Sequence, residues 1–166
     1  MSPYDPLVHY VRPHRGQIKT AERVLELLEM IELDGRFLDR LPSELSGGQK
    51  QRICIARALA AEPDFVICDE VTSALDQIVQ EGILKLLMRL QKDLNLTYLF
   101  ITHDISTVRA ISDQVVVMNL GEVVEQGAKD EVFNPPHPPY TELLLSSVPE
   151  MDPDWLTNLN SERAGL

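Results

Sequence analysis

The segment LSGGQKQR, residues 45–52, places two adjacent glycines at the start of a predicted helix. Ser46 is a good N-cap residue, and the sequence from Gln49 to about Ala61 is rich in the helix formers Ala, Arg, Leu and Gln. Glycines at such a boundary let a ligand approach the backbone closely. The free N–H groups and the positive dipole end of the helix favour an anion such as phosphate. Ser46-Gly47-Gly48 is therefore either a phosphate contact or a plain helix cap.

The composition is that of one ordinary globular domain. The 166 residues are 44% hydrophobic and 25% charged, with a formal net charge of -11 and no basic run of the kind that binds nucleic acid. A nucleic-acid partner is therefore not expected. Cys54 and Cys68 lack the spacing of a metal site and are expected to be small core residues in a reducing compartment. No apolar run reaches membrane-spanning length, so any membrane role is expected to be peripheral.

The hydrophobic pattern predicts an α/β fold with parallel strand pairing. Helices are predicted over residues 20–33, 49–61, 80–94 and 105–111. Strands are predicted over residues 65–68, 98–101, 115–118 and 122–126, the last two as a hairpin. A proline-rich stretch, NPPHPPY, begins at Asn134 and gives way to a short helical run, TELLLSS.

Two acidic residues follow directly after the predicted strand of residues 65–68, whose apolar run is typical of a strand buried on both faces. Open α/β sheets bind ligands at the carboxyl ends of their strands. Asp69 is placed there to hold Mg²⁺, directly or through water. Glu70 is placed to accept a proton from, or orient, a water that attacks a phosphoryl group. The alternative is a solvated acidic pair at a strand end.

Two further segments are candidates for a phosphate site. His103 follows the predicted strand of residues 98–101 and can donate a hydrogen bond to a γ-phosphate oxygen, although a lone loop histidine is usually only a surface residue. The turn TSALD ends at Asp76, which by itself signals only the N-cap of the next helix.

The order LSGGQKQR, FVICDE, TSALD, FITHD resembles the nucleotide-binding subunit of an ATP-binding cassette (ABC) transporter, over nearly the whole chain. The resemblance implies that residues 45–49 are the signature motif and that Asp69 and Glu70 are the Walker B acids. It makes residues 73–76 the D-loop and His103 the switch histidine.

The resemblance also implies ATP and Mg²⁺ as cofactors. In this family two domains sandwich ATP head to tail, and the signature helix of one caps the γ-phosphate held by the phosphate loop of the other. On this basis Glu70 and His103 are the catalytic residues, and Asp69 is the metal ligand. The residues expected to contact ATP are Ser46, Gly47, Gly48, Gln49 and Asp76.

Finer features are similar to the ATPase subunits of dipeptide and oligopeptide importers, namely the FITHDIS segment and the tail HPPYTELLLSSVP. They imply three partners: a second nucleotide-binding domain or subunit, transmembrane permease subunits and, indirectly, a substrate-binding protein. They place the chain peripherally at the cytoplasmic face of the inner membrane. One departure is Val71, where the family usually has proline, and we expect this change to loosen the turn.

The phosphate loop of the family, GxxxxGK[ST], is not recognisable in the sequence. The nearest string, residues 16–20, lacks its first glycine, the glycine before the lysine and a preceding apolar strand. The implied fold is thus a partial P-loop NTPase (ABC ATPase) core, with a parallel sheet and an N-terminal helical subdomain. We expect residues 1–62 to be the helical signature subdomain, 63–133 the Walker B half of the core, and 134–166 a tail of the peptide-importer type.

Two expectations follow for the chain by itself. Without a Walker A loop it is expected to be inactive as an ATPase. The strand of residues 65–68 is expected to have an unpaired edge, because residues 1–16 contain three prolines and make a poor replacement strand.

Two alternative hypotheses are kept. An ABC ATPase of another class, such as a translation factor or a DNA-repair ATPase, is disfavoured by the acidic composition, by TSALD in place of TNHLD and by the lack of a long coiled-coil segment. A non-catalytic truncated fragment would keep the same motifs, and the sequence does not separate it from an active component.

Overall fold

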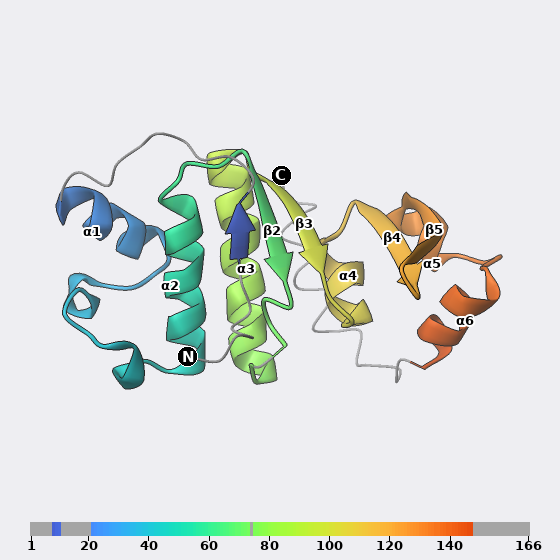
Figure 1. Ribbon diagram of the computed structural model, residues 1–166, viewed down its shortest axis with the longest axis horizontal. Coiled ribbons are helices and arrows are strands. Elements are labelled where there is room, and N and C mark those ends of the chain that lie inside the picture. The colour runs from blue at the N-terminus through green and yellow to red at the C-terminus, as the bar shows by residue number, and fades with distance from the viewer. Residues whose placement is uncertain (1–7, 11–20, 74, 148–166) are drawn as a thin grey trace. The chain divides into compact units, whose positions relative to one another are not determined.

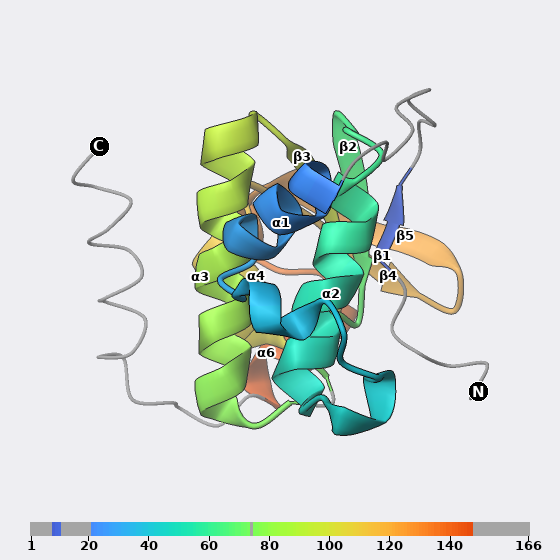
Figure 2. The same ribbon diagram turned by 90° about the vertical axis from the view of Figure 1, so that its left-hand side faces the viewer.

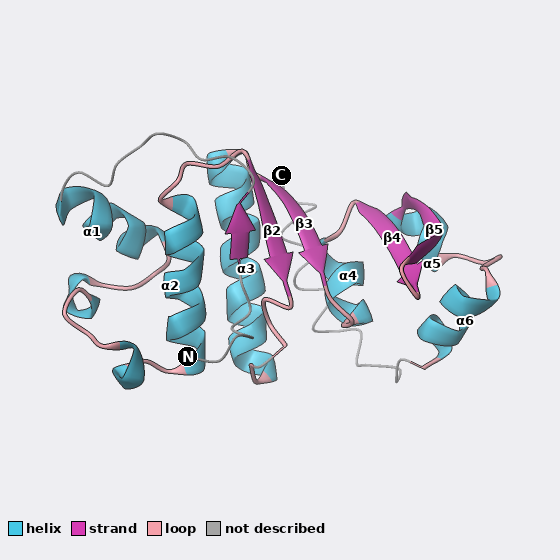
Figure 3. Cartoon of the chain, in the orientation of Figure 1, coloured by secondary structure: helices cyan, strands magenta, loops and turns pink. Residues whose placement is uncertain are grey.

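The computed structural model describes residues 8–10, 21–73 and 75–147, and the chain forms two compact units that divide between Thr102 and His103 (Figure 1). Both units contain helices and strands (Figure 3). The described part of the first unit has β1 (Val8–Tyr10), α1 (Ala21–Met30), α2 (Gly47–Leu59), β2 (Phe65–Asp69), α3 (Gln77–Leu94) and β3 (Thr97–Ile101). The described part of the second has α4 (Ile105–Ile111), β4 (Gln114–Asn119), β5 (Glu122–Ala128), α5 (Lys129–Phe133) and α6 (Pro139–Ser146).

The sheet of the first unit has the strand order β1-β2-β3. β2 and β3 are parallel, with Phe65 opposite Thr97 and Asp69 opposite Ile101, which confirms the predicted parallel pairing of these two strands. On β3 the side chains alternate, as expected for a strand with one covered face. Tyr98 and Phe100 pack against the core, whereas Leu99 and Ile101 are 45% and 48% exposed.

The expectation of an unpaired edge on β2 is wrong. β1 pairs with β2 in the antiparallel sense, with Val8 opposite Cys68 and Tyr10 opposite Val66. The three residues of β1 lie between Pro6 and Pro13 and include no proline, so each has a backbone N–H to donate. The proline count over residues 1–16 therefore misled the prediction for residues 8–10. β2 is the central strand of this sheet.

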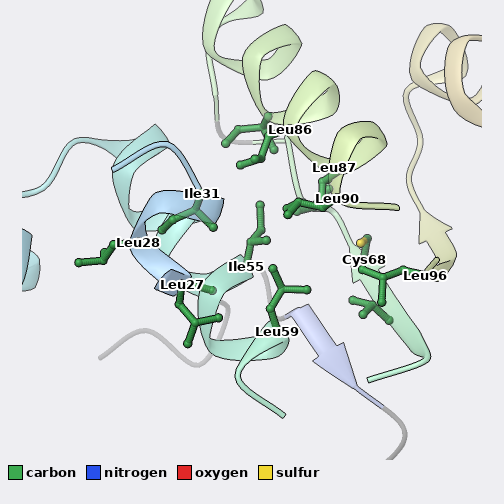
Figure 4. Close-up of a cluster of buried hydrophobic side chains, with 14 residues drawn as sticks. Leu27, Leu28, Ile31, Ile55, Leu59, Cys68, Leu86, Leu87, Leu90 and Leu96 are labelled. Carbon is green, nitrogen blue, oxygen red and sulfur yellow. The ribbon is translucent and has the colours of Figure 1, made fainter. Parts of the chain in front are cut away.

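The helices of the first unit lie on one face of the sheet, with α2 and α3 between α1 and the strands (Figures 1 and 2). The apolar stripes of the three helices meet β2 in one buried cluster (Figure 4). Cys68 is fully buried in this cluster, as expected, whereas Cys54 on α2 is only half-buried. Burial raises the pKa of the Cys68 thiol to about 12. The fully or almost fully buried members of the cluster include Ile31, Ile55, Val66, Cys68, Ile83, Leu86, Leu87 and Leu90.

Two predicted helix boundaries are wrong by about one turn. α1 ends at Met30 and not at residue 33, because Glu32 adopts a left-handed φ of 60° and the Leu33 N–H donates to the Leu28 carbonyl at 2.9 Å. α3 begins at Gln77 and not at residue 80, since Asp76 caps it. In both cases a local cap overrides the apolar periodicity that set the predicted limit.

The second unit contains the predicted hairpin of β4 and β5. The turn of this hairpin has two central residues, Leu120 and Gly121, with φ values of 51° and 86°. Both residues are in the left-handed backbone region, as this type of two-residue hairpin turn requires. The parallel pairing predicted from the alternation of strands and helices does not extend to residues 115–118, because in the described residues β4 pairs with β5 alone. The tight turn supplies β4 with an antiparallel partner immediately after it in the chain.

An ion-pair network holds the end of α1 against α2 and α3. Arg52 donates to the Ile31 carbonyl at 2.7 Å and to a Glu32 carboxylate oxygen at 2.6 Å. Arg89 donates to the Met30 carbonyl at 2.7 Å and lies 3.3 Å from the other Glu32 oxygen. The two arginines therefore bond the last carbonyls of α1, which have no partner within their own helix.

Arg52→Ala tests this network. We expect the free energy of unfolding to fall by about 1–3 kcal/mol, because a charge-assisted bond is lost and the part-buried Ile31 carbonyl loses its donor. The control is Arg36→Ala, which removes an ion pair of the same 2.6 Å length whose arginine is 86% exposed. That loss should be much smaller than the loss for Arg52→Ala, because an exposed ion pair contributes little to stability. Urea unfolding followed by circular dichroism measures both, and equal losses would contradict the role given to Arg52.

Candidate functional site

The signature segment forms a regular helix start. Ser46 is the N-cap of α2, as predicted, and its hydroxyl oxygen accepts from the Gln49 N–H at 3.3 Å. The Gln49 side-chain oxygen accepts from the Ser46 N–H at 2.9 Å, which completes a capping box. Ser46 is exposed, and Gln49 is half-buried. The helix begins at Gly47, two residues before the predicted start, and the box leaves helix N–H groups near an accessible surface.

The two signature glycines lie against the segment that follows the acids. A β-carbon on Gly47 would be 3.3 Å from the Leu75 Cδ2, and a β-carbon on Gly48 would be 2.5 Å from the Val79 Cγ1. Leu75 belongs to the TSALD turn, and Val79 lies in the first turn of α3. The structure therefore brings the predicted signature motif and the predicted D-loop region together within one chain. No motif in the sequence pointed to the Val79 contact.

The two acids lie where they were predicted, at the carboxyl end of β2. Asp69 is the last residue of the strand, and both Asp69 and Glu70 are half-buried. Glu70 has a left-handed φ of 49°, which is uncommon for a side-chain-bearing residue. Its N–H donates to the Ile101 carbonyl at 2.9 Å, so the turn after β2 is fastened to the end of β3.

The turn after the acids is closed by hydrogen bonds to Glu70. The Glu70 carbonyl accepts from the Ser73 N–H at 3.2 Å and from the Ser73 hydroxyl at 3.0 Å. Val71, at the position where the family usually has proline, is 4% exposed and belongs to the buried cluster. Residue 74 of this turn lies outside the described residues.

Asp76 is the N-cap of α3, as its position predicted. Its carboxylate accepts from the Val79 N–H at 3.0 Å. The cap fixes where α3 begins and hence where Val79 lies. Asp76 is itself exposed.

Behind the acids the unit is apolar. Burial raises the pKa of the Tyr98 hydroxyl well above its usual range, and the nearby Cys68 raises it further. The Tyr98 hydroxyl oxygen is buried with no hydrogen-bond partner. Tyr98 lies opposite Val66 on β2, so the middle of this strand has a low-dielectric environment.

His103 opens the second unit. Its side chain is exposed, and Asp104 after it is the N-cap of α4. Asp104 accepts from the N–H groups of Ser106 and Thr107 and from the Thr107 hydroxyl at 2.6 Å. The backbone that follows His103 is thus held by the Asp104 cap of α4. In the same way, the hydrogen bonds of the Glu70 carbonyl hold the backbone that follows Glu70.

Asp69 is the residue predicted to hold Mg²⁺. In the described residues, no three His, Cys, Asp or Glu side chains are grouped closely enough to hold a metal ion by themselves. Mg²⁺ is typically bound by one or two carboxylates together with water and substrate phosphates, so a single half-buried Asp69 fits it. Within the same part of the chain, no helix is long and apolar enough to cross a membrane.

Two protein-family models match the chain. Residues 8–73 match the model of the ABC transporter family, and residues 124–165 match the model of the oligopeptide/dipeptide transporter C-terminal region. The oligopeptide transport ATP-binding protein OppF of Streptococcus mutans is 53% identical over 131 residues, 79% of this chain and 42% of its own length. The dipeptide transport ATP-binding protein DppF of Escherichia coli is 50% identical over 133 residues, 80% of this chain and 40% of its own.

The chain matches a partial ABC ATPase of the peptide-importer type. It spans less than half the length of the two curated relatives. Among solved structures, a dimer of the ATP-binding cassette MJ0796 in a post-hydrolysis state with ADP and Pi matches with a TM-score of 0.59 and 39% identity, over 70% of this chain and 51% of that one. The ADP conformation of MJ1267, an ATP-binding cassette of an ABC transporter, matches with a TM-score of 0.65 and 25% identity, over 76% and 50%.

These matches confirm the predicted fold class, a partial P-loop NTPase core of the ABC ATPase type. They favour the peptide-importer ATPases over the other classes of ABC ATPase that the sequence left open. The string of residues 16–20, which was rejected as a phosphate loop, lies outside the described residues.

The helix-cap role of Asp76 can be separated from its charge by substitution. Asp76→Ala should lower the free energy of unfolding by about 1 kcal/mol, because the Val79 N–H loses its acceptor. Asp76→Asn should leave stability nearly unchanged, since Asn caps as well as Asp does. Urea unfolding of both variants measures the difference. Equal destabilisation by Asn and Ala would show that the charge, and not the cap, stabilises α3.

Proposed function

We propose that this chain is the ATP-binding and ATP-hydrolysing component of a peptide importer and contributes to composite ATP sites shared with a second nucleotide-binding domain. The observation that carries the proposal is the arrangement of the first unit. It has an acidic pair at the end of a parallel strand and a capped, accessible helix start at the signature segment, within a chain that matches part of an ABC ATPase.

Each site residue has a proposed task. Mg·ATP, when bound, supplies the phosphoryl group and the cation that neutralises its charge. Asp69 would hold the cation, Glu70 would orient the attacking water and accept its proton, and His103 would donate a hydrogen bond to the γ-phosphate. The proposed nucleotide contacts are Ser46, Gly47, Gly48, Gln49 and Asp76.

The signature segment and the acids are proposed to serve different nucleotides. The signature of this chain would cap a phosphate bound by a partner, whereas its acids would act on a nucleotide held by a phosphate loop on their own side. The dimeric MJ0796 structure with ADP and Pi supports a paired arrangement. The proposed partners are a second nucleotide-binding subunit, permease subunits and, indirectly, a substrate-binding protein.

The chain is also proposed to have three segments with different tasks and to act at a membrane. Residues 1–62 would form the helical signature part, residues 63–133 the Walker B half and residues 134–166 the peptide-importer tail. This division follows the motifs and differs from the division into compact units at Thr102. The chain would act at the cytoplasmic face of the membrane, bound to permease subunits. A non-catalytic fragment remains the second candidate, because it would retain the same motifs and the same fold.

Glu70→Gln tests the catalytic proposal. With the phosphate loop supplied by the N-terminal part of the S. mutans OppF relative, ATP hydrolysis should fall by about 10²–10⁴-fold, because the general base is lost while its shape is kept. ATP binding should persist. Phosphate release and equilibrium binding of radiolabelled ATP measure the two effects.

The matched control is Glu62→Gln, which makes the same chemical change at another glutamate with a φ of 49°. Glu62 lies 3.3 Å from Arg23 in an exposed ion pair, so its loss should leave hydrolysis unchanged. Full hydrolysis by the Glu70 variant would show that this residue is not the base. Absence of hydrolysis by the wild-type complex would favour the non-catalytic fragment.

The chain by itself is predicted to bind ATP weakly or not at all, and to associate. Leu99 and Ile101 on β3, and Val116 and Met118 on β4, are all about half exposed, and exposed apolar side chains on strands promote self-association. Calorimetry with Mg·ATP and a fluorescent dye for apolar surface test this. A dye-negative monomer with micromolar ATP affinity would contradict the prediction.

A further inference from the structure

We infer that Val79 of α3 is a positioning residue for the signature segment, and that Val79, rather than the nucleotide, is the reason why residue 48 has no side chain, while the Gly48 backbone stays a proposed nucleotide contact. The inference rests on the proposed function, in which Ser46 to Gln49 contact a phosphate. It assigns a further task to one of the two signature glycines and names the side chain that sets the place of the segment.

The direction of the missing Gly48 side chain carries the inference. A β-carbon on Gly48 would point into α3 and lie 2.5 Å from the Val79 Cγ1, closer than two carbon atoms ever pack. The next Val79 atom, its Cβ, is 3.9 Å away, which is ordinary van der Waals contact. The clash therefore comes from a single methyl group of Val79. The space that Gly48 leaves open is taken by the same chain.

Neighbouring contacts continue the close approach of the two helices. One turn further along α2, the Arg52 guanidinium lies 3.8 Å from where a β-carbon on Gly82 of α3 would be. At the helix start, Leu75 fills the space beside Gly47 at 3.3 Å. Leu75 also packs against the buried cluster. α2 is thus held along one side by Leu75, Val79 and Gly82.

Val79 is well placed to transmit a change at the acids to the signature. Its N–H donates to Asp76, so its position is fixed by the cap that ends the turn after Glu70. Its side chain then contacts Gly48. The contact therefore joins two segments that are proposed to serve different nucleotides. The turn after Glu70 belongs to the site of one nucleotide, and the signature segment caps the second nucleotide.

A size-swap experiment tests this. Gly48→Ala should displace the helix start, Val79→Ala should have a small effect, and the double variant should recover, because the 3.9 Å contact then replaces the clash. The control is Ile78→Ala, a neighbouring apolar residue on the same turn of α3 that is 83% exposed. Amide NMR shifts of Gly47 and Gln49 report the displacement in the chain itself, without nucleotide.

The functional test measures ATP hydrolysis by a mixture of this chain and complete S. mutans OppF. The signature glycines of the OppF chain are replaced, so that hydrolysis requires the signature segment of this chain. Gly48→Ala should raise the KM for ATP about tenfold with little change in kcat, since a displaced cap weakens binding. A variant that is merely less folded would lower kcat and leave KM unchanged. The double variant should return KM to within about twofold of Val79→Ala.

The outcomes separate the inference from the proposed function. Recovery of both the shifts and KM in the double variant supports the inference, whereas a double variant as impaired as Gly48→Ala overturns it and leaves the nucleotide as the reason for the glycine. If the wild-type mixture does not hydrolyse ATP but the shifts recover, the proposed function fails and the positioning role stands. If Gly48→Ala does not fold, Val79→Ala and Ile78→Ala are compared by themselves. Val79→Ala should shift the amide signals of Gly47 and Gly48, whereas Ile78→Ala should not. Equal shifts in the two variants would overturn the inference.

Discussion

The close packing of α2 on α3 is the constraint on which the first unit depends. Gly48 admits the Val79 side chain, and the Arg52 guanidinium lies 3.8 Å from the β-carbon position of Gly82, so at each of these points the side chain of one helix packs on a glycine of the other. This packing aligns the apolar stripes of both helices over β2, where Ile55, Ile83 and Val66 are almost completely buried. Arg52 then extends from the same interface to bond the end of α1. Packing between the helices thus fixes the core, the third helix and the position of the signature segment together.

The proposed chemistry requires the same packing to be rigid. A helix N-terminus binds a phosphate well only if its N–H groups are held in place before the ligand arrives. The capping box of Ser46 and Gln49 holds them from within α2, and Val79 of α3 and Leu75 of the preceding turn pack against the two glycines. The acids are held in a corresponding way, because the Glu70 N–H bonds the end of β3 and the Glu70 carbonyl closes the following turn. Each proposed contact to nucleotide or metal in this unit is therefore carried by an element that is fastened to another.

Local signals in the sequence predicted much of this, and contacts between distant segments were the part they could not predict. The caps at Ser46 and Asp76, the parallel pairing of residues 65–69 with 97–101 and the hairpin at Gly121 follow from residue type and alternation, and the structure confirms them. The pairing of β1 with β2 was missed because prolines on either side of residues 8–10 obscured a three-residue strand. The Val79 contact was missed because a glycine pair in sequence suggests ligand approach, whereas the structure shows a side chain from a helix far along the chain. The roles of Asp69, Glu70 and His103 stay predictions, since their chemistry depends on a bound nucleotide and cation.

The measurement that tests the account most directly is sedimentation of the chain mixed with complete S. mutans OppF, with and without ATP, under conditions that prevent hydrolysis. If the signature segment caps a nucleotide held by a partner, a complex containing one copy of each chain should form with Mg·ATP and dissociate when ADP replaces it. The expected reason is that the helix N-terminus of α2 gains a ligand only when the γ-phosphate is present. The same degree of association with ATP, with ADP and without nucleotide would contradict the composite site, and so would the absence of association under all three conditions.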